Sequence, residues 1–295
     1  MLKKLKTSLL VAIIISVLFG MFIGFTQIYP ASTQAQTENP KLTLEVSTPQ
    51  SSYLQLEPIP FQFNLSNQTN QPITWKGILL LFGGNVDLLI QEQNGSESRF
   101  AGSKYAVGLS KIPETLNPGQ SRQVTDLFRG VKEFEAAFPR PGNYQVRVEF
   151  TYKDVSDEQK RVTILSNPVS INIREPQNFN RQAYDYIKGP LQTRLTQNNV
   201  EATAQVQQDF VNNYGSTVYA KYVIFDLART YQFLGEDLKA LRELCKISGE
   251  NFYYSKQVER TLRLIDVKLH PLDLTPLPEN VPTPVRPHPC ARVQN

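Results

Sequence analysis

Residues 144–152 read Tyr-Gln-Val-Arg-Val-Glu-Phe-Thr-Tyr, and in this stretch apolar and polar side chains alternate without a break. Because successive side chains of a β-strand point to opposite faces of the sheet, the alternation predicts a strand with one buried and one solvated face. The apolar face carries Tyr144, Val146, Val148, Phe150 and Tyr152. This is the clearest strand signal in the chain, and we expect the flanking sequence to supply its partners.

The same period of two recurs on both sides of this stretch, between turn signals rich in Gly, Pro and Asn. Further strands are predicted at 42–46, 59–65, 77–82, 86–92, 123–128, 161–165 and 169–174. Eight or nine short strands within about 135 residues, with no helical period among them, are typical of an antiparallel β-sandwich.

Two phrases refine this prediction, Leu-Asn-Pro-Gly-Gln-Ser at 116–121 and Phe-Pro-Arg-Pro-Gly-Asn-Tyr at 138–144. Together they resemble the late strands of bacterial immunoglobulin-like domains, in which a Pro-Gly-x-Tyr corner stands at the start of a long strand. The resemblance covers residues 41–174 and implies that the hydroxyl of Tyr144 bonds back to the chain to fix the corner. Trp75 departs from the antibody pattern because no cysteine pair accompanies it, so both a core and a rim position stay open for it.

At Glu175-Pro176 the spacing of the apolar residues changes from every second residue to every third or fourth residue. Asn178 is placed to cap a helix over 179–188, which we expect Gly189-Pro190 to end. From Val200 to Leu269 the apolar residues then recur at helical spacing, interrupted by short polar turns. This second half therefore predicts a set of amphipathic helices.

Part of this helical stretch has the spacing of a tetratricopeptide repeat. The matching positions are Leu227, Ala228, Tyr231, Gly235, Ala240 and Leu244. The resemblance covers about residues 202–269 and implies that the small alanines let paired helices approach closely while Gly235 makes the turn. The resemblance is incomplete. Ile224 stands where the family often has tryptophan, Gly215 and Phe252 stand where it has proline, and only one repeat is complete.

The N-terminus has the pattern of a segment that a membrane translocase recognises. Lys3, Lys4 and Lys6 precede an uncharged, mostly apolar run from Thr7 to Ile28. We expect residues 1–35 to be a signal peptide or a membrane anchor; cleavage after Ala35 and retention both stay open. In either case the rest of the chain is expected outside the cytoplasm, with membrane contact through residues 7–28 if the leader is kept.

The predicted organisation is thus β then α. It comprises a leader at 1–35, an immunoglobulin-like β-sandwich at 36–175, a tetratricopeptide-like helical domain at 176–269 and a proline-rich disordered tail at 270–295. The two cysteines, Cys245 and Cys290, fall in a helical stretch and in the tail. Pairing stays open in an exported chain, but a free buried Cys245 is the favoured interpretation.

Composition argues against several classes of function. The formal net charge is +4, and three of those charges are the leader lysines, so residues 36–295 are nearly neutral. A neutral body predicts no nucleic-acid binding. The two histidines, His270 and His288, lie in or beside the tail, and no nucleophile elbow, zinc helix or phosphate loop is present. We therefore expect no catalytic residues, no metal and no cofactor; a carboxylate pair among the 27 acids is the one catalytic device left open.

These features predict an exported, non-enzymatic binding or scaffolding protein of the bacterial cell envelope, acting on a protein or peptide partner. The expected contact residues lie on one helix, and they are Tyr222, Asp226, Arg229, Gln232 and Phe233. An alternative is an inhibitor or carbohydrate-binding accessory protein that acts through the β-sandwich.

Overall fold

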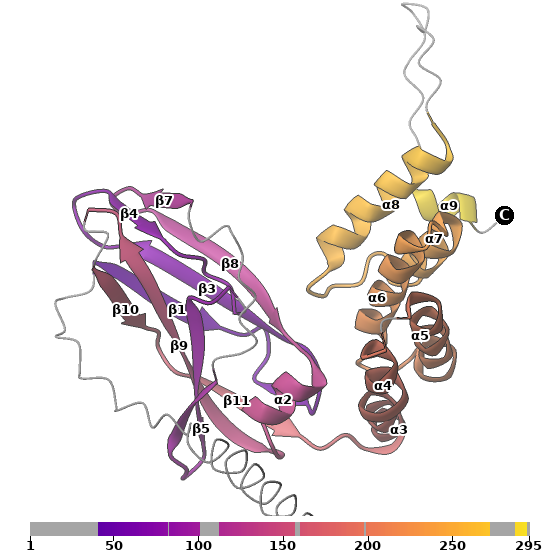
Figure 1. The fold of residues 1–295 in the computed structure, drawn as a ribbon, viewed down its shortest axis with the longest axis horizontal. Helices are drawn as coiled ribbons and strands as arrows, with labels where there is room; N and C mark the ends of the chain where they lie inside the picture. The colour runs from indigo at the N-terminus through magenta and orange to yellow at the C-terminus, as the bar shows by residue number, and fades with distance from the viewer. Residues whose placement is uncertain are drawn as a thin grey trace, which may run out of the picture. The chain divides into compact units, whose positions relative to one another are not determined.

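We describe the protein from a computed structural model, which places residues 41–293 apart from 82, 101–111, 157–159, 198 and 272–286. Strands lie between residues 42 and 174 with one short helix among them, and the other described helices follow from residue 178 onward (Figure 1). The predicted order of a β region and then a helical region is confirmed. The predicted leader at 1–35 is outside the described residues. Of the helices that are described, none combines the length and the hydropathy that crossing a bilayer requires.

The smaller sheet places β3 (Ile59–Asn67) between β1 (Leu42–Ser47) and β8 (Ser121–Phe128), and both neighbours run antiparallel to it. Alternate side chains of β1 are buried, beginning with Leu42, as the sequence pattern predicts. One face of this sheet therefore contributes to a hydrophobic core.

The larger sheet is organised around β9 (Gly142–Asp154). Strands β5 and β11 both pair with residues 144–146 of β9, so they lie on its opposite edges and β9 is an interior strand. The other strands extend the sheet outward from these pairs. The bounds are β2 Ser52–Leu54, β4 Ile73–Lys76, β5 Val86–Glu92, β6 Glu97–Phe100, β7 Pro113–Leu116, β10 Arg161–Leu165 and β11 Val169–Arg174.

The alternation at 144–152 is confirmed, since the five side chains of the predicted apolar face are all buried. The strand predicted at 77–82 is wrong, because residues 77–81 form no strand. Instead, the N–H of Leu81 donates to the carboxylate of Asp126 at 2.7 Å, so a side chain takes the place of a neighbouring strand for this N–H. Trp75, on β4, is a core residue.

The hydroxyl of Tyr144 closes the corner at the start of β9 by donating to the carbonyl oxygen of Arg140 at 2.6 Å. Tyr144→Phe is expected to lower the free energy of unfolding by about 1 kcal/mol, because the carbonyl loses a partner. Tyr152→Phe is the matched control, since Tyr152 is a second buried tyrosine on the same face of β9 and does not take part in the corner. Urea denaturation followed by tryptophan fluorescence measures both variants, and equal losses would contradict the role given to the corner.

An aromatic cluster joins the two sheets around Phe128 of β8. Its ring lies 5.5 Å from that of Phe100 on β6 of the larger sheet, and edge-to-face geometry relates the two. Helix α2 (Val131–Ala137), which the sequence analysis did not predict, adds Phe134 to the cluster at 6.2 Å from Phe128. The short connection after β8 is thereby held against the core.

The helical region begins with α3 (Asn178–Tyr186), which does not stop at Gly189-Pro190 as predicted. The chain continues through a π-helical turn, η2 (Ile187–Leu191), into α4 (Gln192–Leu195). Pro190 has no N–H to donate, and the wider turn accommodates it. Asn178 is itself the first residue of α3, with no side-chain cap. The later helices are α5 (Val200–Tyr214), α6 (Ala220–Phe233), α7 (Asp237–Lys246) and α8 (Ser255–Leu269).

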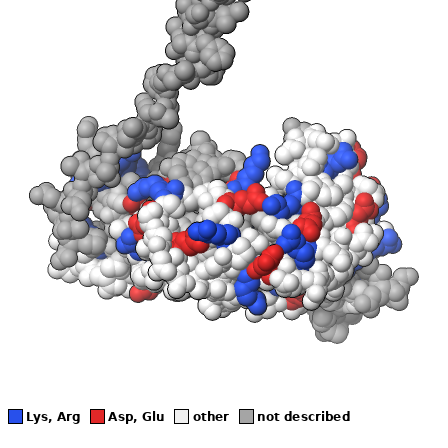
Figure 2. Space-filling view, turned by 90° about the horizontal axis from the view of Figure 1, so that it is seen from below, with Lys and Arg blue, Asp and Glu red and all other residues white. Residues whose placement is uncertain are grey.

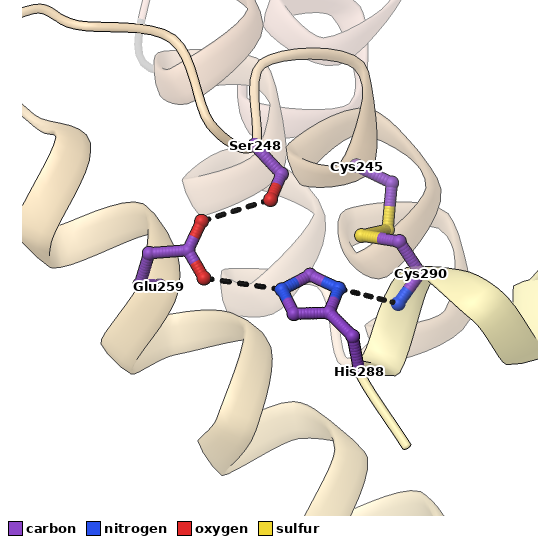
Figure 3. The surroundings of a disulfide bond; sticks show 5 residues. All are labelled: Cys245, Ser248, Glu259, His288 and Cys290. Atoms are coloured by element: carbon purple, nitrogen blue, oxygen red, sulfur yellow. Dashed lines mark hydrogen bonds and ion pairs between the residues drawn. A yellow bond between two sulfur atoms is a disulfide. The ribbon is translucent and has the colours of Figure 1, made fainter.

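A disulfide between Cys245 and Cys290 ties the end of the chain to α7, so the preferred interpretation of a free Cys245 is wrong (Figure 3). The expectation of a disordered tail also fails at its end, because Pro289–Val293 forms helix α9. Figure 3 shows the ring of His288 beside the disulfide, with Nε2 3.2 Å from the carboxylate of Glu259 on α8. The C-terminal helix is therefore fixed by covalent and polar contacts that connect it to both α7 and α8.

Candidate functional site: an apolar groove along helix α6

Four of the five predicted contact residues lie on one face of α6. Tyr222, Asp226, Arg229 and Phe233 follow one another at intervals of four, three and four residues, which places them in a row along the helix. All four line a single open groove of about 660 Å³. Gln232 does not line it, because a residue beside Phe233 in the chain is rotated by about 100° around the helix.

The walls of this groove, which we call the α6 groove, come from both regions of the chain. Residues 41–295 form one structural unit, so the groove lies within that unit. The β region supplies Leu56, Pro58 and Val131, and the early helices supply Ile187, Leu191 and Leu195. The sequence analysis missed these residues. Their apolar character gives no signal that distinguishes a groove wall from an ordinary core position.

An ion pair links the two sides of the α6 groove. The guanidinium of Arg129, in the connection between β8 and α2, donates to both carboxylate oxygens of Asp226 at 3.0 and 2.8 Å. Burial alone would lower the pKa of Arg129, but the negative charge of Asp226 outweighs this and the pKa is raised. Asp226 is therefore occupied by an internal partner. A contact between Asp226 and a ligand stays a prediction, and such a ligand would meet a carboxylate that Arg129 already binds.

Tyrosines form the inner part of the groove. The hydroxyl of Tyr219 donates to the carbonyl oxygen of Gln55 at 2.8 Å, which is a second link between helices and strands. Tyr222 packs edge-to-face on Phe252 at 5.6 Å, and burial raises its pKa. A phenol with a raised pKa stays protonated near neutrality and keeps its capacity to donate a hydrogen bond.

The rim of the groove has a different chemistry. Phe233 is 78% exposed, an unusual position for an aromatic side chain, and Arg229 is also exposed. Among the described residues no ion pair to Arg229 is present. The α6 groove thus combines an apolar wall with a cation and an aromatic ring at its mouth.

Several other charged side chains are paired with one another within the fold. Within the described part of the chain no group of three or more His, Cys, Asp or Glu side chains is arranged to hold a metal ion. On the outer face of the larger sheet, Arg99 binds both Asp87 and Glu149, while Arg147 binds Glu97. The face drawn in Figure 2 likewise shows basic and acidic side chains intermixed, with no broad area of a single sign. The face drawn there carries no continuous basic track for a phosphate backbone.

Comparison with known proteins gives only remote similarity. No family model matches the sequence, and a search of curated proteins gave no match. The chain is similar to the sporulation control protein Spo0M from Bacillus subtilis, with a TM-score of 0.27 and 13% identity over 51% of this chain and 56% of that one. It is also similar to a CARDB domain from Pyrococcus furiosus in complex with di-metal ions, with a TM-score of 0.25 and 13% identity over 50% of this chain and 98% of that one.

A third similar structure is a β-glucosidase from Listeria innocua in complex with glucose, with a TM-score of 0.23 and 11% identity over 45% of this chain and 16% of that one. The chain spans about half of the length of Spo0M. Similarities at this level carry no argument about ligand or activity.

Proposed function

We propose that the protein is an exported, non-enzymatic binding protein of the bacterial cell envelope that holds a segment of another protein in the α6 groove. The observation that supports this most is the row of Tyr222, Arg229 and Phe233 along one open, largely apolar groove. A volume of about 660 Å³ lies within the range of pockets that recognise small molecules or a few side chains. The expected ligand is a peptide with spaced apolar side chains and one acidic group that meets Arg229.

The architecture proposed for this protein is an immunoglobulin-like sandwich followed by a tetratricopeptide-like helical array. Support for the sandwich comes from the core shared by the two sheets and from the Tyr144 corner at the start of β9. Support for the repeat comes from α6 and α7, where Ala228 and Ala240 are fully buried and Gly235 has a φ of 76° between the helices. A positive φ at the end of a helix favours glycine, as the repeat pattern requires.

Export is supported by the disulfide between Cys245 and Cys290, because such bonds persist in oxidising compartments and are rare in the cytosol. The lysine-rich, apolar N-terminal sequence points to the same destination. A protein placed outside the cytoplasm is suited to holding partners in the envelope.

Selection from a library of random peptides displayed on phage tests the proposed function with the full chain as target. We expect the enriched peptides to share spaced apolar residues and to bind Phe233→Glu about tenfold or more weakly, because a charge enters the mouth of the groove. Leu238→Glu is the matched control, since Leu238 is also an exposed apolar residue but lies on α7 outside the groove. The proposal would be refuted if no peptides were enriched, or if the enriched peptides bound Phe233→Glu as well as the unmodified chain. Peptides whose binding is lost only when the sandwich surface is changed would favour the β-region alternative.

A further inference from the structure

Helix α8 carries a second surface that the α6 groove does not include. Its exposed side bears Lys256, Arg260, Arg263, Leu264 and Val267, which we call the basic face of α8. The leucine is 59% exposed and the valine 49%, although both are large apolar side chains. Cations therefore occupy the first half of this face and apolar groups the second half.

The face is positively charged because the acidic side chains of α8 are bound by other parts of the chain. The helix has two acids, and both are engaged by the C-terminal segment: Glu259 contacts His288 at 3.2 Å, and buried Asp266 contacts Arg292 at 3.5 Å. Burial would raise the pKa of Glu259, but hydrogen bonds from His288 and Ser248 outweigh it and lower the pKa (Figure 3). In contrast, Lys256, Arg260 and Arg263 form no ion pair with any described residue.

The remaining sides of α8 are covered. Val258, Leu262 and Ile265 are buried in the core, and the C-terminal segment is held to α8 by the Glu259–His288 contact and the Asp266–Arg292 ion pair. The turn between α7 and α8 adds Gly249, Glu250 and Asn251 to the basic face, and together they enclose an open hollow of about 740 Å³. The hollow is open to solvent over most of its extent.

We infer that the basic face of α8 is a docking surface for an acidic amphipathic helix of a partner protein. A helix as long as α8, about 22 Å, presents a row of side chains with the same spacing as the row it would meet. Its carboxylates would lie against Lys256, Arg260 and Arg263, and its apolar side chains would cover Leu264 and Val267. This surface is separate from the α6 groove and does not depend on the function proposed for it.

The test uses a synthetic helix-forming peptide of about 15 residues, with leucines along one face and glutamates beside them. Fluorescence anisotropy measures its binding to the full chain, with a peptide in which lysine replaces every glutamate as control. We expect the acidic peptide to bind and to gain helicity, and binding to weaken as salt rises. The double change Arg260→Glu and Arg263→Glu should weaken it about tenfold or more, because attraction becomes repulsion.

Two variants keep the result specific. Arg242→Glu reverses an exposed arginine on α7 and should leave binding unchanged, and Phe233→Glu should do the same because it alters only the α6 groove. Leu264→Ser should weaken binding, since the apolar half of the face is then smaller. Equal binding of the acidic and basic peptides, or no binding, would overturn the inference. The inference would also be overturned if the chain sedimented with vesicles of phosphatidylglycerol and phosphatidylcholine but did not bind the peptide. That result would assign the face to lipid.

Discussion

Cys290→Ser is expected to lower the free energy of unfolding by about 4 kcal/mol. The disulfide joins residues 45 positions apart, and closing a loop of that length removes conformational entropy from the unfolded chain. Loss of the bond should also loosen α9, which brings His288 to Glu259 and Arg292 to Asp266. Urea denaturation monitored by circular dichroism at helical wavelengths measures the change.

The control for this prediction is chemical reduction. Dithiothreitol should destabilise the unmodified chain by a similar amount, whereas it should have no effect on Cys290→Ser or Cys245→Ser. The double variant should resemble either single variant, because both remove the same bond. A change below about 1 kcal/mol, or a reductant that leaves the transition where it is, would mean that the bond contributes little to the folded protein.

Phe128→Ala is the second large effect that we expect, with a loss of about 4 kcal/mol. The side chain is fully buried, and its ring contacts those of Phe61, Phe100, Phe134 and Phe138. Truncation leaves a cavity between the two sheets and under α2. The residue that follows is Arg129, so the damage should reach the wall of the α6 groove and weaken peptide binding as well.

Two comparisons separate this effect from a general loss of apolar surface. Phe128→Leu keeps most of the volume and should cost less than half as much as Phe128→Ala. Leu165→Ala changes a half-exposed side chain on β10 and should cost under about 1 kcal/mol. Thermal and urea denaturation measure all three. If Phe128→Ala were no more destabilising than Leu165→Ala, the aromatic cluster could not be the junction of the sheets.

Local patterns in the sequence were sufficient for much of the architecture. The alternation of Tyr144 to Tyr152 predicted β9 because strand geometry fixes which side chains are buried. The spacing of Tyr222, Asp226, Arg229 and Phe233 predicted a shared helix face for the same kind of reason. Short elements such as α2 were missed, since a single turn or two of helix leaves too little period to detect.

Contacts between distant segments were outside the reach of such patterns. Arg129 and Asp226 are 97 residues apart, so no local spacing could indicate that they pair. The Cys245–Cys290 bond depends on the path of the chain back to α7, which composition does not encode. Asp226 was for this reason predicted as a ligand contact, whereas its carboxylate is bound by Arg129 within the protein.

Photo-crosslinking shows whether a protein segment binds in the α6 groove. A photoreactive phenylalanine analogue is placed at position 233 of the full chain and, in a separate sample, at position 238 on α7. Each is irradiated with a peptide selected on the unmodified chain. We expect a crosslink from position 233 and none from position 238. Crosslinking from position 238 alone, or equally from both, would contradict this expectation.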